Sequence, residues 1–154
     1  MEDSHYQYLL DIVSNSTATN SDKIVAFISL SNINNAKGDI SEALKYASMA
    51  TIVTASPRAD ACCCIGDVYM QLGNTEWAIK WFESAISNVS PDCESGYYTW
   101  IPLMKIAQAH ILNCDFKTAE EYVSAARKLL KKDTEEILDI TRAIDMFKSQ
   151  ISKK

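Results

Sequence analysis

Apolar residues recur every three or four positions along most of the chain, which is the spacing of a helix with one buried face. In the first segment this stripe consists of Tyr6, Leu9, Leu10 and Val13. In the last segment it consists of Ile137, Ile140, Ile144, Phe147 and Ile151. Only 4 glycines and 3 prolines occur in the 154 residues, too few for the many tight turns of a β-sandwich or barrel. The pattern therefore predicts an all-α fold.

Three breaks in the pattern, at Gly38, Gly73 and Cys114, are each followed by Asp or Asn. Such side chains accept hydrogen bonds from the free N–H groups at the start of a helix. Asp39 also has Glu42 three residues on, which is the spacing of a capping box. We therefore expect a new helix to begin after each break.

The remaining helix boundaries follow from polar residues and prolines. The polar stretch 14–22 separates the first two helices, and we expect Ser21 to cap the second one. Pro57 and Pro91 lie where helices must end. The last helix is expected to begin at Asp133.

The three breaks share one register, which indicates internal repeats. Alanine lies five residues after each break, at Ala43, Ala78 and Ala119. It returns 12 residues after each break, at Ala50, Ala85 and Ala126. Small side chains allow two antiparallel helices to approach closely, and each helix pair leaves an apolar face that a neighbour must cover. The register thus predicts three stacked helix pairs.

The middle unit resembles a tetratricopeptide repeat, a helix pair of about 34 residues. The positions that match are Ile65, Gly66, Tyr69, Leu72, Gly73, Ala78, Phe82 and Ala85. The outer units depart from the pattern: Ser31 and Asn34 replace the usual Gly and Tyr of the first, and His110 and Cys114 replace the Tyr and the turn Gly of the third. Over residues 22–131 the resemblance implies a right-handed superhelix of antiparallel helix pairs, about three repeats long.

Together these expectations describe a single domain, 1–154. Its predicted parts are an N-terminal helix 2–14, repeat one 22–56, repeat two 58–90, an insertion 91–99, repeat three 100–131 and a capping helix 133–152.

The insertion is rich in aromatic residues. The second and third breaks are 41 residues apart, which is about seven more than one repeat needs. One interpretation is that the extra residues fold back onto Trp81 through ring packing. The alternative is an ordered loop that is merely longer.

Residues 56–86 and 95–102 also resemble the helical-repeat region attached to bacterial family 2 glycosyltransferases. The matching groups are Arg58-Ala59-Asp60, Cys62 to Cys64, Ala78-Ile79-Lys80-Trp81-Phe82 and Tyr97-Tyr98-Thr99-Trp100-Ile101-Pro102. The catalytic α/β domain of those enzymes and an Asp-x-Asp pair are both missing from this sequence. The resemblance implies an accessory domain or a stand-alone relative of such an enzyme.

Composition narrows the range of partners. The net charge is −5 and Lys and Arg do not cluster, which disfavours nucleic acid. No run of about 18 apolar residues predicts a membrane span. The N-terminus lacks the features of a signal peptide, so we expect a cytoplasmic protein. The five cysteines, an odd number, are then most simply free thiols.

The consecutive cysteines Cys62, Cys63 and Cys64 raise the question of a metal or redox site. Neighbours on a helix point about 100° apart, so three consecutive thiols do not converge on one tetrahedral ion. The repeat register places Cys62 toward the hairpin partner, Cys63 on the concave face and Cys64 between them. A reactive thiol needs a nearby cation, and Arg58 is the one close in sequence. We expect no metal and no cofactor.

Residues for catalysis are also not evident. His5 and His110 are isolated in the sequence. Asp60 and Asp67 lie two helical turns apart and could share one face, but exposed acids on helices are more often solvated or ligand-facing. We expect no catalytic residues and no enzymatic activity of this chain.

The predicted working surface is the concave groove lined by the first helix of each pair. Its candidate partner-binding residues are Asn32, Cys63, Asp67, Met70, Gln71, Met104, Lys105 and Gln108. This mixture suits a peptide or a helix lying in a groove. The alternative is that a terminal helix covers these positions.

The carboxylate clamp of chaperone-binding repeat domains can be compared with the same groove. That clamp needs Lys, Asn, Asn, Lys and Arg at positions that here hold Ile28, Asn32, Cys64, Ile101 and Lys105. Asn32 matches and Lys105 is a partial substitute, so an acidic C-terminal tail is a disfavoured ligand.

Two functions remain in view. The first is a scaffold that binds a protein or peptide partner in its groove, with homo-oligomerisation left open. The second is the glycosyltransferase-associated domain, which would assist acceptor binding or assembly.

Overall fold

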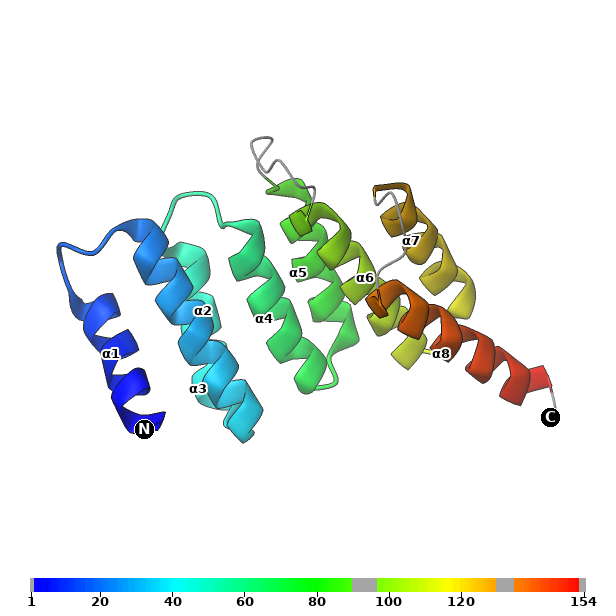
Figure 1. The fold of residues 1–154 in the computed structure, drawn as a ribbon, viewed down its shortest axis with the longest axis horizontal. Helices are drawn as coiled ribbons and strands as arrows, with labels where there is room; N and C mark the ends of the chain where they lie inside the picture. Colours follow the sequence, from blue (N-terminus) through cyan, green and yellow to red (C-terminus); the bar gives the residue numbers. More distant parts are fainter. Residues whose placement is uncertain (1, 90–96, 130–134, 153–154) are drawn as a thin grey trace.

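The computed structural model describes residues 2–89, 97–129 and 135–152, and these segments form helices joined by turns, without strands. The helices are α1 (Glu2–Ser14), α2 (Asn20–Lys37), α3 (Ile40–Ile52), α4 (Ala59–Gln71), α5 (Thr75–Ser87), α6 (Tyr97–Leu112), α7 (Phe116–Leu129) and α8 (Glu135–Ser152). They are stacked along the molecule from α1 at the N-terminal end to α7 and α8 at the C-terminal end, with α3 behind α2 in this view (Figure 1). The predicted all-α fold is confirmed.

Helix pairs are the building unit of this stack. Helices α2 and α3, α4 and α5, and α6 and α7 pack against each other as pairs, and the first helices α2, α4 and α6 contact one another in sequence. Helix α1 packs on α2 at one end, and α8 packs on both α6 and α7 at the other. The two terminal helices therefore cover the apolar faces that a stack of repeats leaves at its ends.

The turns within the three pairs share one geometry. The residue before each second helix's cap has a left-handed backbone, with φ of 82° at Gly38, 79° at Gly73 and 60° at Cys114. The following residue accepts a hydrogen bond at 3.2 Å from the backbone N–H three positions on, in Asp39, Asn74 and Asp115 alike. These three predicted caps are confirmed.

The predicted cap of α2 is wrong by two residues. Thr19, which has an extended backbone, accepts a hydrogen bond from the N–H of Asp22 at 3.0 Å, so α2 begins at Asn20. The hydroxyl of Ser21 instead accepts a hydrogen bond from Nη1 of Arg58. The local sequence does not show which of Thr19 and Ser21 caps α2, because the distant Arg58 engages the hydroxyl of Ser21.

The small residues predicted from the repeat register lie at the helix crossings. Five of the alanines that follow the breaks by five or 12 residues have no exposed surface: Ala43, Ala78, Ala85, Ala119 and Ala126. At Gly66 the approach is closest: a Cβ atom built there would lie 2.4 Å from Cε1 of Phe82, whose ring is fully buried. In the first unit Ser31 takes this place and donates its buried hydroxyl to the carbonyl of Ala43 at 2.7 Å.

Two predictions concern residues that are only partly described. Most of the predicted insertion, 91–99, lies outside the described residues, and its contact with Trp81 therefore stays a prediction. Helix α6 already begins at Tyr97, three residues before the predicted start of repeat three. The predicted cap Asp133 also lies outside the described residues.

None of the helices in the described segments combines the length and the apolar character needed to cross a membrane.

The contact between Gly66 and Phe82 predicts a large effect of one methyl group. We expect Gly66→Ala to lower the free energy of unfolding by about 1–3 kcal/mol, the usual cost of overpacking, even though alanine favours a helix over glycine by about 1 kcal/mol. Denaturant unfolding measures the change. In the double variant with Phe82→Leu, the loss should be smaller than the sum of the single losses. A Gly66→Ala protein as stable as the wild type would contradict this packing.

The left-handed backbone at Cys114 predicts that glycine is the better residue there. A non-glycine residue in this conformation destabilises the folded state by about 1–2 kcal/mol. Glycine removes this strain, but it also loses more conformational entropy on folding, which offsets part of the gain. We therefore expect Cys114→Gly to raise the free energy of unfolding by about 1 kcal/mol. Cys114→Ala keeps the Cβ atom and serves as the control. An equal gain in both variants would show that backbone strain is not the cause.

Candidate functional site

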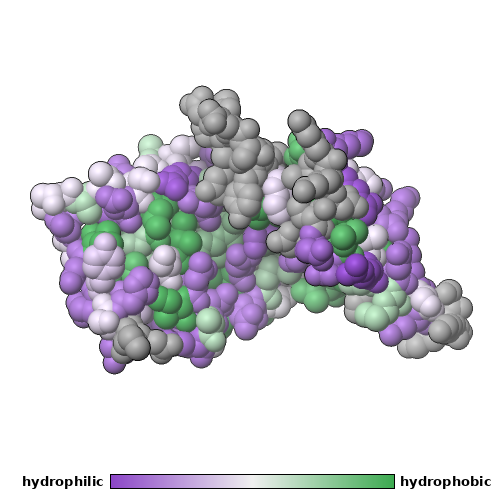
Figure 2. Space-filling view, viewed as in Figure 1, coloured by the Kyte–Doolittle hydropathy of each residue, from purple (hydrophilic) through white to green (hydrophobic). Residues whose placement is uncertain are grey.

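A cavity of about 360 Å³ lies on the face formed by the first helices of the three pairs. These helices, α2, α4 and α6, face the viewer in Figure 1. The described residues that line the cavity are Ile28, Asn32, Asp60, Cys63, Cys64, Asp67, Ile101 and Lys105. In the space-filling view of this face, hydrophobic residues gather over α2 and toward α4, with hydrophilic residues around them (Figure 2).

Four of the predicted partner-binding residues come together in this cavity: Asn32, Cys63, Asp67 and Lys105. Gln71 and Gln108 are exposed but do not line it. Met70 is half-buried and packs against the cluster around Phe82. Half of the predicted set thus lines one cavity. Asn32 comes from α2, Cys63 and Asp67 come from α4, and Lys105 comes from α6.

Met104 differs from its predicted place on the groove. It is 3% exposed and belongs to the core shared by α6, α7 and α8. The neighbouring Lys105 faces the cavity, and consecutive helix residues point about 100° apart, so Met104 turns toward α8. There it joins the cluster that contains Ile137, Ile140 and Ile144.

The five positions of the carboxylate clamp all line this cavity. They are Ile28, Asn32, Cys64, Ile101 and Lys105. The repeat register therefore placed these positions on a common surface. Their residue types differ from those of the clamp, so the cavity offers apolar and thiol groups where the clamp has Lys and Asn. Asp60 was missing from the predicted partner-binding set, although its spacing of two helical turns from Asp67 places both carboxylates on one face of α4.

An ion pair spans the cavity from α4 to α6. Nζ of Lys105 donates to Oδ1 of Asp67 at 2.7 Å, and the two side chains are 27% and 37% exposed. The same Nζ lies 6.0 Å from the centre of the Phe82 ring. Burial raises the pKa of Asp67, while the charge and the hydrogen bond of Lys105 act to lower it. Asp67 is thus a partly desolvated carboxylate whose charged form Lys105 stabilises.

The second carboxylate of the cavity is held by an arginine. Arg58 donates from Nε to Oδ1 of Asp60 at 3.1 Å and from Nη2 to Oδ2 at 2.7 Å. Its Nη1 donates to the hydroxyl of Ser21 at 2.9 Å. This group ties the start of α4 to the first turn of α2, so Asp60 has a structural role and Arg58 is not placed to activate a thiol.

Of the three consecutive thiols, Cys62 faces the hairpin partner, as the register predicted, whereas Cys63 and Cys64 both line the cavity. Cys62 has no exposed surface, and its Sγ lies 3.8 Å from the hydroxyl of Ser84 on the hairpin partner α5. Cys63 lines the cavity. Cys64 is buried and its Sγ lies 4.0 Å from Oδ1 of Asn32. In the described part of the chain, no three His, Cys, Asp or Glu side chains are grouped to hold a metal ion.

Burial keeps these thiols protonated at neutral pH. It raises the pKa of Cys63 to about 12, despite the opposing charge of Lys105, and that of Cys64 to about 11. Burial also raises the pKa of Cys62. Since the thiolate is the nucleophile, Cys63 contributes an apolar surface to the cavity rather than a reactive group.

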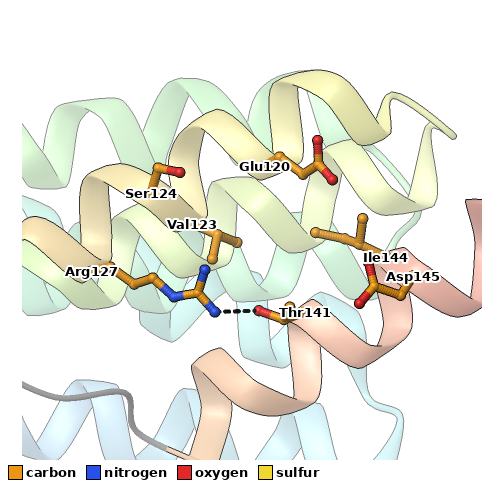
Figure 3. A pocket seen from close by; sticks show the side chains of 7 residues that line it. All are labelled: Glu120, Val123, Ser124, Arg127, Thr141, Ile144 and Asp145. Carbon is orange, nitrogen blue, oxygen red and sulfur yellow. Dashed lines mark hydrogen bonds between the residues drawn. The ribbon is translucent and has the colours of Figure 1, made fainter.

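A second, smaller cavity of about 240 Å³ lies between α7 and α8 (Figure 3). Arg127 of α7 donates to the hydroxyl of Thr141 of α8 at 3.0 Å. Lys148 of α8 forms an ion pair with Glu120 of α7. These polar contacts hold the terminal helix in place beside the apolar cluster that contains Val123 and Ile144, and both residues also line the cavity.

Comparison with known proteins shows that this arrangement is similar to solved structures. The Yersinia enterocolitica type III secretion chaperone SycD, in complex with a peptide of the translocator YopD, is similar with a TM-score of 0.64 at 16% sequence identity. The match covers 91% of this chain and 100% of that chain. No protein-family model and no curated protein matches the sequence. The likeness and the packed helix pairs confirm the tetratricopeptide-like fold.

The raised pKa values predict that the three thiols resist modification. In a Cys93→Ser, Cys114→Ser variant at pH 8, we expect a disulfide reagent such as Ellman's reagent to react with Cys62, Cys63 and Cys64 only slowly, because all three stay protonated and largely buried. Unfolding in guanidinium should release three equivalents at the rate of free cysteine. A fast native reaction with one equivalent would identify a reactive thiol and contradict the proposed environment.

Proposed function

We propose that this chain is a non-catalytic scaffold of the tetratricopeptide type that binds a peptide, or an extended segment of a protein, in its concave groove. The observation that carries the proposal is the cavity shared by α2, α4 and α6, where side chains from three repeats face one space. A ligand that lies across the three helices would contact all of them at once, which is how helical repeats form extended binding surfaces.

The side chains of the cavity suit a peptide better than a small polar metabolite. Ile28 and Ile101 are half-buried and supply apolar walls on α2 and α6. Asn32 is exposed, and its amide can both donate to and accept from a peptide backbone. Apolar walls with a few polar groups that fix the backbone are typical of peptide-binding grooves.

The structural neighbour supports the same class of function. SycD is described as a chaperone in complex with a peptide of another protein. Its fold covers nearly all of this chain, so a peptide-binding role is open to the same architecture. The glycosyltransferase-associated alternative has no such support from the comparisons and stays a prediction of the sequence.

A variant that fills the groove tests the proposal. Partners are first captured from an extract and identified by mass spectrometry, and overlapping synthetic peptides of each captured protein are then measured for direct binding to the purified chain. Because Asn32 is exposed, Asn32→Trp should fold normally and fill the cavity, and we expect it to weaken binding by about tenfold or more. Glu83→Trp, on an exposed position of α5 away from the cavity, is the matched control. Peptides that bind both variants equally would place the binding surface elsewhere.

A further inference from the structure

We infer that Asp67 sets the charge preference of this groove: its ligand presents an aliphatic side chain beside a lysine or arginine, and acidic segments are rejected. The inference rests on the proposed peptide-binding function and specifies the class of peptide.

Lys105 is already neutralised before a ligand arrives. It is the one cationic side chain among the described residues that line the cavity. Its Nζ lies 2.7 Å from Oδ1 of Asp67 and above the ring of Phe82, so two interactions hold it inside the groove. An acidic ligand would have to displace Asp67 or lie beside its charge in a partly desolvated space, where like charges repel strongly. Lys105 therefore cannot act as the cation of a carboxylate clamp.

Asp67, in contrast, can still accept a hydrogen bond from a ligand. The hydrogen bond from Lys105 engages Oδ1, and the side chain is 37% exposed at the cavity. An ionised carboxylate has room for several donors on its two oxygens, so a lysine or arginine of a ligand can reach Oδ2 without breaking the existing pair. Burial disfavours the charged form of Asp67, and a second cation would offset that cost.

The other carboxylate does not offer the same opportunity. Arg58 occupies both oxygens of Asp60, so Asp60 brings almost no uncompensated charge to the groove. The net charge of the chain, −5, adds a weak long-range attraction for basic ligands. Charge recognition at short range is thus concentrated on Asp67.

The apolar half of the preference comes from the walls of the cavity. Ile28 on α2 and Ile101 on α6 lie on either side of Cys63 and Cys64 of α4, whose thiols are protonated. An aliphatic side chain buried among these four would exchange water for apolar contact. The aliphatic and the basic groups of the ligand must be close together, because both surfaces belong to one cavity.

A random peptide library displayed on phage tests this preference with the full chain as the target. We expect the selected peptides to combine aliphatic residues with Lys or Arg, and to be depleted of Asp and Glu. The best peptide is then synthesised with its basic residues kept, replaced by Gln or replaced by Glu, and the affinities are measured by fluorescence anisotropy.

Two substitutions act in opposite directions. In Asp67→Asn, which conserves shape, the basic peptide should lose about tenfold in affinity, the usual effect of losing a hydrogen bond to a charged group. The Glu peptide should gain affinity because Lys105 is then free. In Lys105→Met the basic peptide should bind more tightly than to the wild type. Circular dichroism melting confirms that each variant is folded.

The outcomes separate this inference from the proposed function. Selected peptides that are acidic, or a basic peptide whose affinity is the same for the wild type and both variants, would overturn the role of Asp67 while leaving the groove as the binding site. A library that yields no peptide sensitive to Asn32→Trp would overturn the groove itself, and this inference with it.

Discussion

The close contact between Gly66 of α4 and the ring of Phe82 of α5 is the constraint on which the centre of the structure depends. Because Gly66 has no side chain, the ring of Phe82 packs directly on the α4 backbone, and α4 can have only a narrow range of rotations about its axis. That rotation turns Cys62 toward α5 and leaves Cys63 and Asp67 on the face that carries the cavity. The ring of Phe82 also lies below Nζ of Lys105, so the same side chain that packs the repeat supports the ion pair of the groove.

The groove combines an apolar interior with charges that largely cancel. Asp60 is paired within its own helix start, and Asp67 is paired across to α6. Such pairing reduces the cost of partly burying carboxylates, and it also removes the free cations that a repeat domain needs to capture an acidic tail. In the proposed function, the same framework of positions that elsewhere forms a carboxylate clamp would therefore take a different class of peptide.

The predictions that succeeded depend on local chemistry and on periodicity. Alanine spacing and the capping residues Asp39, Asn74 and Asp115 located the three turns, because a helix cap acts within four residues of itself. The repeat register also placed Asn32, Cys63, Asp67 and Lys105 on one face, since a repeated helix pair repeats the direction of its side chains. The resemblance to glycosyltransferase-associated repeats, which depended on short matches of residue type, gained no support.

The amino-acid sequence by itself determined the class of fold and the three turns within the helix pairs, and it placed Asn32, Cys63, Asp67 and Lys105 on one face, because these follow from the 3.6-residue period and from contacts between near neighbours. Tertiary structure alone decided which of those residues share one cavity. It turned Met104 into the core under α8, engaged Ser21 with Arg58, and joined Asp67 to Lys105 across 38 positions of the chain. Such contacts depend on the rotation and the spacing of packed helices, which no local pattern in the sequence encodes.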